Sequence, residues 1–239
     1  MCELLYQTDA YLREFDAKVV GVDTQSRSIL LDRSAFYPGG GGQPCDFGSL
    51  WVEGIEYTVV KVKKQGEDVL HFISGAVELP PVIGSVHGVI DWERRYKLMR
   101  THTALHILCG TVFRDYGALV TGGDMEPLAG RMDFEFERMQ AGLVHDIEEA
   151  VNREIVNARD LRVKILPRED AFKIPDLIRT KINLLPEGIP NVRTVEIVGL
   201  DLQADGGTHV NNTGEVGKVR VVDYKSKGAI NKRIYIAIE

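Results

Sequence analysis

Cysteine is scarce in this sequence, and several other features are missing. The 239 residues include three cysteines, Cys2, Cys45 and Cys109, which are not closely paired. An odd and widely spaced set argues against a disulfide framework and favours a reducing compartment. No apolar run is long enough to cross a bilayer, and the polar, acidic N-terminus is unlike a signal peptide. We therefore expect a cytoplasmic protein with no membrane partner.

Positive charge is also in deficit, because the formal net charge is −6 at pH 7. This counts mildly against a nucleic-acid partner, since such proteins are more often basic. The basic residues are nevertheless clustered, with one group before His102 and another near the C-terminus. These groups are Arg94, Arg95, Lys97 and Arg100, and Lys218, Arg220, Lys225, Lys227, Lys232 and Arg233. They are either solvated surface, which charge alone favours, or contacts to phosphates.

The first part of the chain has the pattern of β-structure. Six short apolar or alternating runs are separated by turn-rich stretches, which is typical of a small β-barrel. The expected strands cover residues 19–22, 28–32, 50–52, 57–63, 69–72 and 86–90.

The pattern changes at Asp91 and becomes helical. Apolar residues recur at helical spacing from about residue 93 to 113 and from about 140 to 158. Strands are expected at 163–166, 192–197, 216–224 and 233–237, and a short helix near 168–172. The sequence therefore predicts an α+β fold with two domains. A small β-barrel with a glycine-rich loop covers residues 1–91, and an α+β domain with an antiparallel sheet and helices covers residues 92–239.

Two histidines lie four residues apart inside the first expected helix. His102 and His106 would share one helix face with Cβ atoms about 6 Å apart, so both imidazoles could meet one metal ion. Alone, the pair is a weak indication, because most such pairs are surface or core residues. Asp205-Gly-Gly-Thr-His209 adds a carboxylate and a third imidazole on a turn that glycine permits. Three imidazoles with a carboxylate, or with a water, suit zinc.

Four ordered segments resemble the editing domain of alanyl-tRNA synthetase and its free-standing relatives, the AlaX proteins. Two of the segments resemble the family's histidine motifs. A third resembles the family's short central strand, and the fourth resembles its closing strand. They are Met99-Arg-Thr-His-Thr-Ala-Leu-His-Ile-Leu108, Gly206-Gly-Thr-His-Val210 followed by Asn212-Thr-Gly-Glu-Val-Gly217, Arg131-Met-Asp-Phe134, and Lys227-Gly-Ala-Ile-Asn-Lys-Arg-Ile-Tyr235. The resemblance covers most of the chain. It implies one Zn²⁺ per chain, held by His102, His106 and His209.

Asp205 departs from the family pattern, which has cysteine at this position. Asp205 is either a fourth ligand, which we favour slightly, or a neighbour that orients a histidine or a water. The first alternative gives a closed site, whereas the second leaves room for water. Cys109 is a remote substitute for the missing thiolate and more simply a buried hydrophobic residue.

A run of four glycines marks a second candidate site. It can approach a ligand and offer N–H groups, although a flexible hairpin is the simpler alternative. Bulky neighbours argue against a flexible linker, and no Walker lysine follows. The run resembles the glycine-rich motif of the AlaX type that carries an N-terminal barrel, AlaX-M. This implies an amino-acid pocket formed by Ser34, Gly39, Gly40, Gly41, Gly42 and Gln43, in which we expect the Ser34 hydroxyl to meet a seryl hydroxyl.

The resemblance implies a trans-editing hydrolase that removes serine, with glycine as a second substrate, from mischarged alanine tRNA. No nucleotide cofactor is needed, and the oligomeric state is left open. A site that requires the seryl hydroxyl would discriminate against alanine by about 1–3 kcal/mol. Thr208, Gly206 and Gly207 are the candidate oxyanion donors for ester hydrolysis.

Three alternatives compete with this hypothesis. A zinc protease would have His-Glu-x-x-His, but Thr103 occupies the glutamate position. A non-catalytic, zinc-containing tRNA-binding module would have a closed metal site. Editing of another mischarged tRNA is the third, because the threonyl-tRNA synthetase editing domain shares the histidine and cysteine signature. The barrel and the glycine run favour the alanine system.

Overall fold

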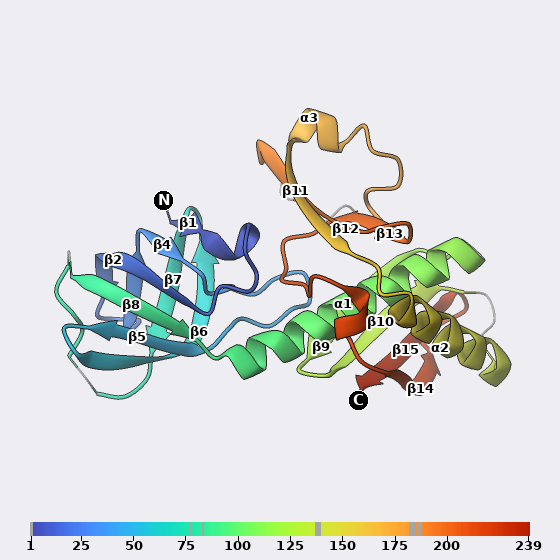
Figure 1. Ribbon diagram of the computed structural model, residues 1–239, viewed down its shortest axis with the longest axis horizontal. Helices are drawn as coiled ribbons and strands as arrows, with labels where there is room; N and C mark the ends of the chain where they lie inside the picture. Colours follow the sequence, from blue (N-terminus) through green and yellow to red (C-terminus); the bar gives the residue numbers. More distant parts are fainter. Residues whose placement is uncertain (1, 77, 83, 137–139, 182–184, 186–187) are drawn as a thin grey trace. The chain divides into compact units, whose positions relative to one another are not determined.

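The computed structural model describes residues 2–76, 78–82, 84–136, 140–181, 185 and 188–239 (Figure 1). The chain divides into two compact units, Met1–Tyr96 and Lys97–Glu239. We call them the first and second unit, and their boundary falls inside helix α1 (Trp92–Tyr116). The domain boundary proposed from the sequence, at residue 91, directly precedes this helix. Within the described ranges, no helix combines the length and the apolar character needed to span a membrane.

The first unit is built around a closed six-stranded barrel. Its strands pair in the order β2-β3-β7-β6-β5-β8, and β8 closes onto β2. Every pairing is antiparallel. The strands are β2 (Glu14–Asp23), β3 (Ser28–Leu31), β5 (Gly48–Val52), β6 (Ile55–Gln65), β7 (Asp68–Ile73) and β8 (Ser85–Ile90). All six predicted strands are therefore confirmed.

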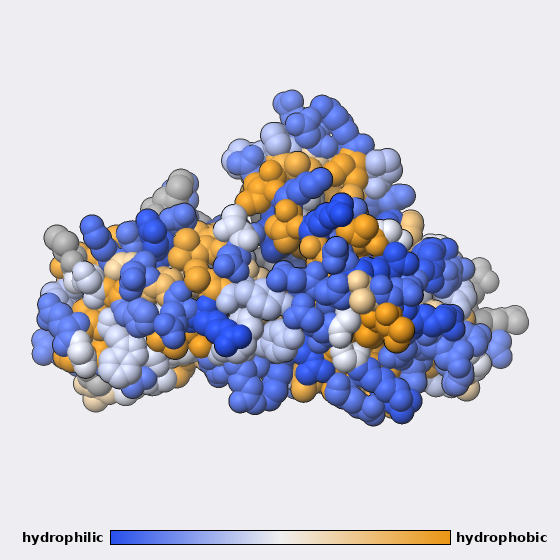
Figure 2. Space-filling model, viewed as in Figure 1, coloured by the Kyte–Doolittle hydropathy of each residue, from blue (hydrophilic) through white to orange (hydrophobic). Residues whose placement is uncertain are grey.

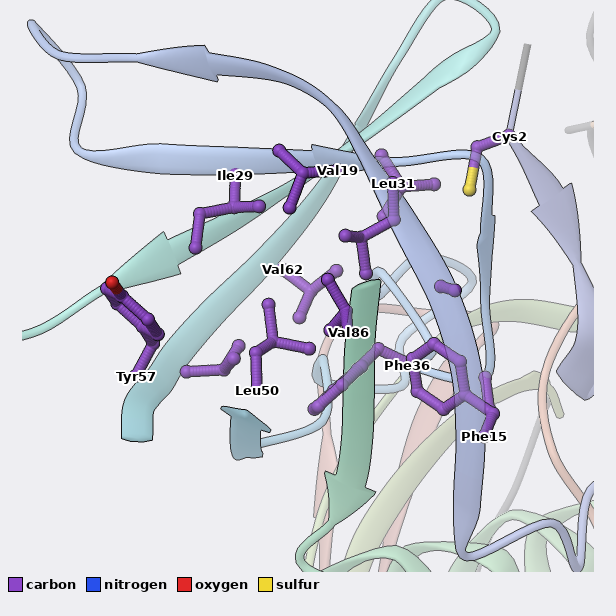
Figure 3. Close-up of a cluster of buried hydrophobic side chains, with 14 of the residues drawn as sticks. Cys2, Phe15, Val19, Ile29, Leu31, Phe36, Leu50, Tyr57, Val62 and Val86 are labelled. Carbon is purple, nitrogen blue, oxygen red and sulfur yellow. The ribbon is translucent and has the colours of Figure 1, made fainter. Parts of the chain in front are cut away.

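Apolar side chains fill the barrel because alternate residues of its strands point inward. Ile29 and Leu50, from two different strands, are completely buried in this cluster (Figure 3). Burial of such side chains stabilises a fold by about 25 cal/mol per Å² of apolar surface. Gly88 in β8 leaves the room that Phe15 needs, since a Cβ at Gly88 would lie 2.4 Å from the Phe15 ring.

Two short strands lie outside the barrel. β1 (Glu3–Leu4) and β4 (Arg33–Ser34) form a parallel pair, and a single turn of 3-10 helix, η1 (Leu5–Gln7), follows β1. Two residues per strand carry no detectable alternation, so the sequence pattern did not predict this pair.

The second unit contains two antiparallel sheets, which confirms the predicted α+β class. One has the order β14-β15-β10-β9 and the other β11-β12-β13. The strands are β9 (Val120–Glu126), β10 (Ala129–Glu135), β11 (Leu161–Pro167), β12 (Asn191–Ile197), β13 (Asp201–Ala204), β14 (Val219–Ser226) and β15 (Asn231–Ile238). The helices are α1, α2 (Ala141–Val156), α3 (Arg168–Ala171) and the 3-10 turn η2 (Thr213–Glu215). β9 was not predicted, because Gly122 and Gly123 interrupt its alternation.

The sheet β11-β12-β13 has two different faces. One packs against an apolar cluster that includes Ala171 and Leu177. The other carries Val195 of β12 paired with Gln203 of β13, and Ile197 paired with Asp201. Because side chains two residues apart share a face, Asp201 and Gln203 point in the same direction.

Figure 2 shows hydrophobic surface over this sheet, where Val163 of β11 is 41% exposed.

Candidate metal centre

Four side chains of the second unit converge on one point. His102 and His106 project from α1, and Asp205 and His209 lie on the turn that follows β13. One ligand atom from each lies within 4.8 Å of every other. The imidazole centroids of His102 and His209 are 4.2 Å apart, and those of His102 and His106 are 5.1 Å apart. The structure thus brings together the four residues that the sequence singled out as metal ligands.

The three imidazoles present Nε2 to the carboxylate of Asp205. Its Oδ2 lies 3.5 Å from Nε2 of His102 and 3.9 Å from Nε2 of His106. Its Oδ1 lies 3.0 Å from Nε2 of His209. A tetrahedral zinc ion with bonds of about 2.1 Å separates its ligand atoms by about 3.4 Å. The spacing and the donor set, three nitrogens and one oxygen, therefore fit a divalent metal such as zinc.

Burial lowers the pKa of two of these groups, and neighbouring groups outweigh burial at the other two. It lowers the pKa of His102 well below its ordinary value and that of His209 to about 4, so both rings are neutral, as metal binding requires. Burial also acts to lower the pKa of His106, but hydrogen bonds to Asp201 and Asp205 outweigh it and raise the pKa to about 9. Burial opposes ionisation of Asp205, yet the surrounding imidazoles hold its pKa well below the usual range.

Neighbouring groups hold the His209 ring and the backbone of the Asp205 turn in place. Oγ1 of Thr103 lies 3.2 Å from Nδ1 of His209 and accepts a hydrogen bond from the Val210 N–H. Thr103, which stands where a zinc protease has its glutamate, therefore contacts a candidate ligand. Nη1 of Arg193 donates to the carbonyls of Asp205 and Gly207, at 3.0 and 2.9 Å. Arg193 lies in β12, outside the motif, so the sequence pattern did not identify it.

The three candidate oxyanion donors differ in their surroundings. Gly206 is exposed, and a Cβ there would meet no atom within 4 Å. The N–H of Gly207 donates to Oδ1 of Asp205 at 2.7 Å, and Thr208 is completely buried. Neither glycine is among the residues with positive φ, so the turn does not need left-handed backbone at these two positions. The open approach at Gly206 is the feature that glycine provides.

The glycine run forms an ordered loop in the first unit. Gly39, Gly40, Gly41 and Gly42 have φ values of 85°, 131°, 57° and 88°, a region that favours glycine. The Gly40 N–H donates to the Gln43 carbonyl, and the Gln43 N–H donates to the Gly40 carbonyl. Tyr37 is buried, and its hydroxyl donates to the Gly40 carbonyl at 3.0 Å. The loop is therefore fixed by its neighbours, not a flexible linker.

A buried ion pair closes the base of this loop. Arg95 and Asp46 are both fully buried and joined by several hydrogen bonds. Asp46 also accepts from the Tyr37 N–H at 2.6 Å, and Arg95 donates to the Ala35 carbonyl at 2.6 Å. Arg95 is thus neither solvated surface nor a phosphate contact, which were the two interpretations of its basic cluster.

Ser34 is also completely buried in the first unit. Its Oγ lies 2.8 Å from Nε2 of His71 and accepts from the Phe36 N–H at 3.2 Å. Nδ1 of His71 lies 3.0 Å from the carbonyl of Ile29. Both ring nitrogens of His71 therefore have partners within the first unit. The contact between Ser34 and a seryl hydroxyl stays a prediction.

The C-terminal basic cluster is partly engaged within the second unit. Arg233 pairs with Asp133 through two hydrogen bonds. Nζ of Lys232 is bound to the carbonyls of Gly228 and Ala229. Lys225 pairs with an aspartate on its own strand. These three residues therefore contribute less to an RNA-binding surface than their number in the sequence indicates.

Comparison with known proteins adds to this geometry. The profile of the threonyl and alanyl tRNA synthetase second additional domain matches residues 192–235, and that of class II (A) tRNA synthetases matches residues 7–94. The alanyl-tRNA editing protein AlaX-M of Saccharolobus solfataricus is 40% identical over 243 residues, with 100% of both chains covered. That of Methanosarcina acetivorans is 36% identical over 250 residues, covering 100% of this chain and 99% of the relative.

Alanine–tRNA ligases are similar to this chain over a smaller share of their own length. The alanine–tRNA ligase of Ignicoccus hospitalis is 38% identical over 224 residues, which cover 91% of this chain and 24% of the ligase. The barrel, the histidine cluster and the profile matches define a protein of the synthetase-related editing class. The two relatives described above that match this chain over its full length are both AlaX-M proteins, which identifies the family within that class. The chain belongs to the AlaX-M family of alanyl-tRNA editing proteins.

Proposed function

We propose that this chain is a trans-editing aminoacyl-tRNA deacylase that hydrolyses Ser-tRNA(Ala), with Gly-tRNA(Ala) as a second substrate. Membership of the AlaX-M family supports an editing role on alanine tRNA. The observation that carries the catalytic part of the proposal is the convergence of three histidines and one aspartate in the second unit. Because its substrate is an aminoacyl-tRNA, the reaction takes place in the cytoplasm.

The same four residues hold one Zn²⁺ in this proposal. His102, His106 and His209 bind through Nε2, and Asp205 binds through its carboxylate. Four protein ligands leave no open position for a zinc-bound water, so zinc held there would act by orienting the substrate's amino group and not by supplying a hydroxide. Thr103 and Arg193 keep the His209 ring and the Asp205–Gly207 turn in position, as their contacts indicate.

The reaction is the hydrolysis of an ester between an amino acid and a ribose hydroxyl. Water adds to the carbonyl carbon, and the ribose oxygen then leaves and takes up a proton. Donors directed at the developing oxyanion lower this barrier. Gly206 is the best placed of the three candidates, because it is exposed while Thr208 is buried and the Gly207 N–H is bonded to Asp205.

Amino-acid selection is assigned to the glycine-rich loop. A pocket that requires the seryl hydroxyl leaves a polar group unpaired when alanine binds. The backbone of Gly39, Gly40, Gly41 and Gly42 is the contact surface, and Gln43 is a polar contributor beside it. Ser34 has a second role that its contacts support, which is to hold β4 to β7 through His71.

The proposal is tested by the rates at which Ser-, Gly- and Ala-tRNA(Ala) are deacylated. Wild-type chain should hydrolyse the seryl ester fastest and leave the alanyl ester intact. His102→Ala should abolish the activity, whereas His145→Ala, which removes an exposed histidine of α2, should not. Binding of tRNA without turnover by the wild type would contradict the proposal and favour a non-catalytic tRNA-binding module. Faster turnover of another mischarged tRNA would favour the third alternative.

A further inference from the structure

Asp201 is a buried carboxylate that none of the sequence motifs includes. Its side chain is 0% exposed at the start of β13. Oδ2 lies 3.2 Å from Nδ1 of His106 and accepts a hydrogen bond from Nε2 of Gln203 at 2.6 Å. Oδ1 lies 3.5 Å from Nε of Arg179. A fully buried carboxylate is costly unless it is paired, and here one oxygen is directed at a candidate metal ligand.

The two nitrogens of His106 therefore face two different carboxylates. Nδ1 faces Asp201, whereas Nε2 faces Asp205 at 3.9 Å. A ring that donates its Nδ1–H to a carboxylate leaves the Nε2 lone pair for a metal, and the anion increases its basicity. We propose that Asp201 is a positioning residue that holds His106 with Nε2 directed at the metal. This inference rests on the zinc site of the proposed function.

The surroundings hold Asp201 where this role requires it. Gln203, two residues later on the same face of β13, donates to Asp201 and lies 3.3 Å from Sγ of Cys109. Gly110 of α1 permits the close approach, because a Cβ there would lie 2.9 Å from Cβ of Asp201. The guanidinium of Arg179 stacks 3.8 Å above the ring of Phe113, further along α1. The carboxylate is thus fixed against the helix that carries His106.

His106 differs from His209 in this respect. Nδ1 of His209 faces a neutral hydroxyl, that of Thr103, whereas Nδ1 of His106 faces an anion. Loss of Asp201 should therefore weaken metal binding through His106. Asparagine keeps an oxygen that can accept from Nδ1–H but has no charge, so it separates orientation from simple packing.

The test measures metal affinity of the full chain. Metal-free wild type, Asp201→Asn and Asp201→Ala are titrated with Zn²⁺ against a competing chelator, and the visible spectrum of bound Co²⁺ reports the ligand geometry. The control is Glu154→Gln, which removes the charge of another buried carboxylate of this unit, one paired with Arg114 and Arg159. Unfolding of each metal-free chain is measured in parallel.

We expect Asp201→Ala to weaken zinc binding by about 10- to 100-fold and to change the Co²⁺ spectrum. Asp201→Asn should fall between Asp201→Ala and wild type, and Glu154→Gln should bind like wild type. If Asp201→Ala does not fold, a weaker affinity and altered spectrum in folded Asp201→Asn carry the test. Wild-type affinity and spectrum in folded Asp201 variants would overturn the inference.

The proposed function fails separately from this inference. A loss of metal affinity on substitution of Asp201, in a chain that does not deacylate any tRNA, would support the role of Asp201 and contradict the deacylase. A wild-type chain that deacylates Ser-tRNA(Ala) but binds no metal would support the deacylase and contradict the role of Asp201.

Discussion

Nε2 of His209 lies 3.0 Å from Oδ1 of Asp205, four residues earlier on the same turn. This carboxylate stands where the AlaX pattern described above has cysteine. It lies close enough to the three imidazoles for all four groups to bind one metal ion. Two contacts fix the orientation of the Asp205 carboxylate. Its Oδ1 accepts a hydrogen bond from the Gly207 N–H, and Arg193 donates to the backbone carbonyls of Asp205 and Gly207. In the proposed site Asp205 is the fourth ligand, because its two carboxylate oxygens lie beside the Nε2 atoms of all three imidazoles.

Substitutions of Asp205 should follow ligand chemistry. Asp205→Cys should retain tight zinc binding, because a thiolate is also an anionic zinc ligand. Asp205→Ala should lose more than about 100-fold in affinity, the upper bound for a residue that only supports a ligand. Zinc per chain, measured by mass spectrometry after chelator competition, checks both. Full zinc retention by Asp205→Ala would show that Asp205 is not a ligand.

The buried pair of Arg95 and Asp46 should contribute strongly to the stability of the first unit. Arg95→Met should lower its free energy of unfolding by about 3–5 kcal/mol, because Asp46 is left as an uncompensated buried charge. Arg94→Met should cost about 1 kcal/mol, since Arg94 mainly stacks on Phe47.

Urea unfolding followed by tryptophan fluorescence measures this loss. Both tryptophans of the chain, Trp51 and Trp92, lie in Met1–Tyr96, so the signal reports on the first unit. Equal losses for Arg94→Met and Arg95→Met would contradict the role assigned to the ion pair.

His71 should make the first unit sensitive to acid. Burial lowers the pKa of His71 to about 4, whereas an unfolded histidine has a pKa of about 6.5. Below about pH 6.5 the unfolded chain binds a proton that the folded chain excludes, so stability falls as the pH falls towards 4. The loss over this window should be about 3 kcal/mol.

The same fluorescence experiment, repeated between pH 7 and pH 4, checks the contribution of His71. His71→Leu should be less stable at pH 7, because Ser34 loses its partner, but its stability should fall less steeply with acid. Parallel pH profiles for wild type and His71→Leu would show that His71 titrates normally in the folded chain.

Two helical glycines should respond oppositely to alanine. Gly110→Ala should destabilise the second unit by about 1–3 kcal/mol, because its Cβ would lie 2.9 Å from Cβ of Asp201 and 3.2 Å from the Leu200 carbonyl. Gly142→Ala should stabilise it by about 0.5 kcal/mol, because nothing lies within 4 Å and alanine favours helix. Circular dichroism during urea unfolding measures both. Stabilisation by Gly110→Ala would contradict the close packing of β13 on α1.

The sequence predicted those features that depend on local spacing. Alternation over a few residues was enough for the six barrel strands, and the separation of His102 and His106 was enough for a shared helix face. The turn from Asp205 to His209 carried its own motif. Contacts between distant residues left no such signal. Asp201 and His106 are 95 positions apart, and Arg95 and Asp46 are 49 apart. Arg95 therefore looked like part of a basic surface cluster, because its partner could not be identified from neighbouring residues.

The central claim is that the histidine and aspartate cluster hydrolyses mischarged alanine tRNA with a bound metal. The most direct measurement is the rate of Ser-tRNA(Ala) deacylation by chain stripped of metal, before and after one equivalent of Zn²⁺ is restored. The account predicts that stripping abolishes the rate, that zinc restores it in wild type, and that zinc does not restore it in His102→Ala. Equal rates for the stripped, restored and His102→Ala chains would contradict it.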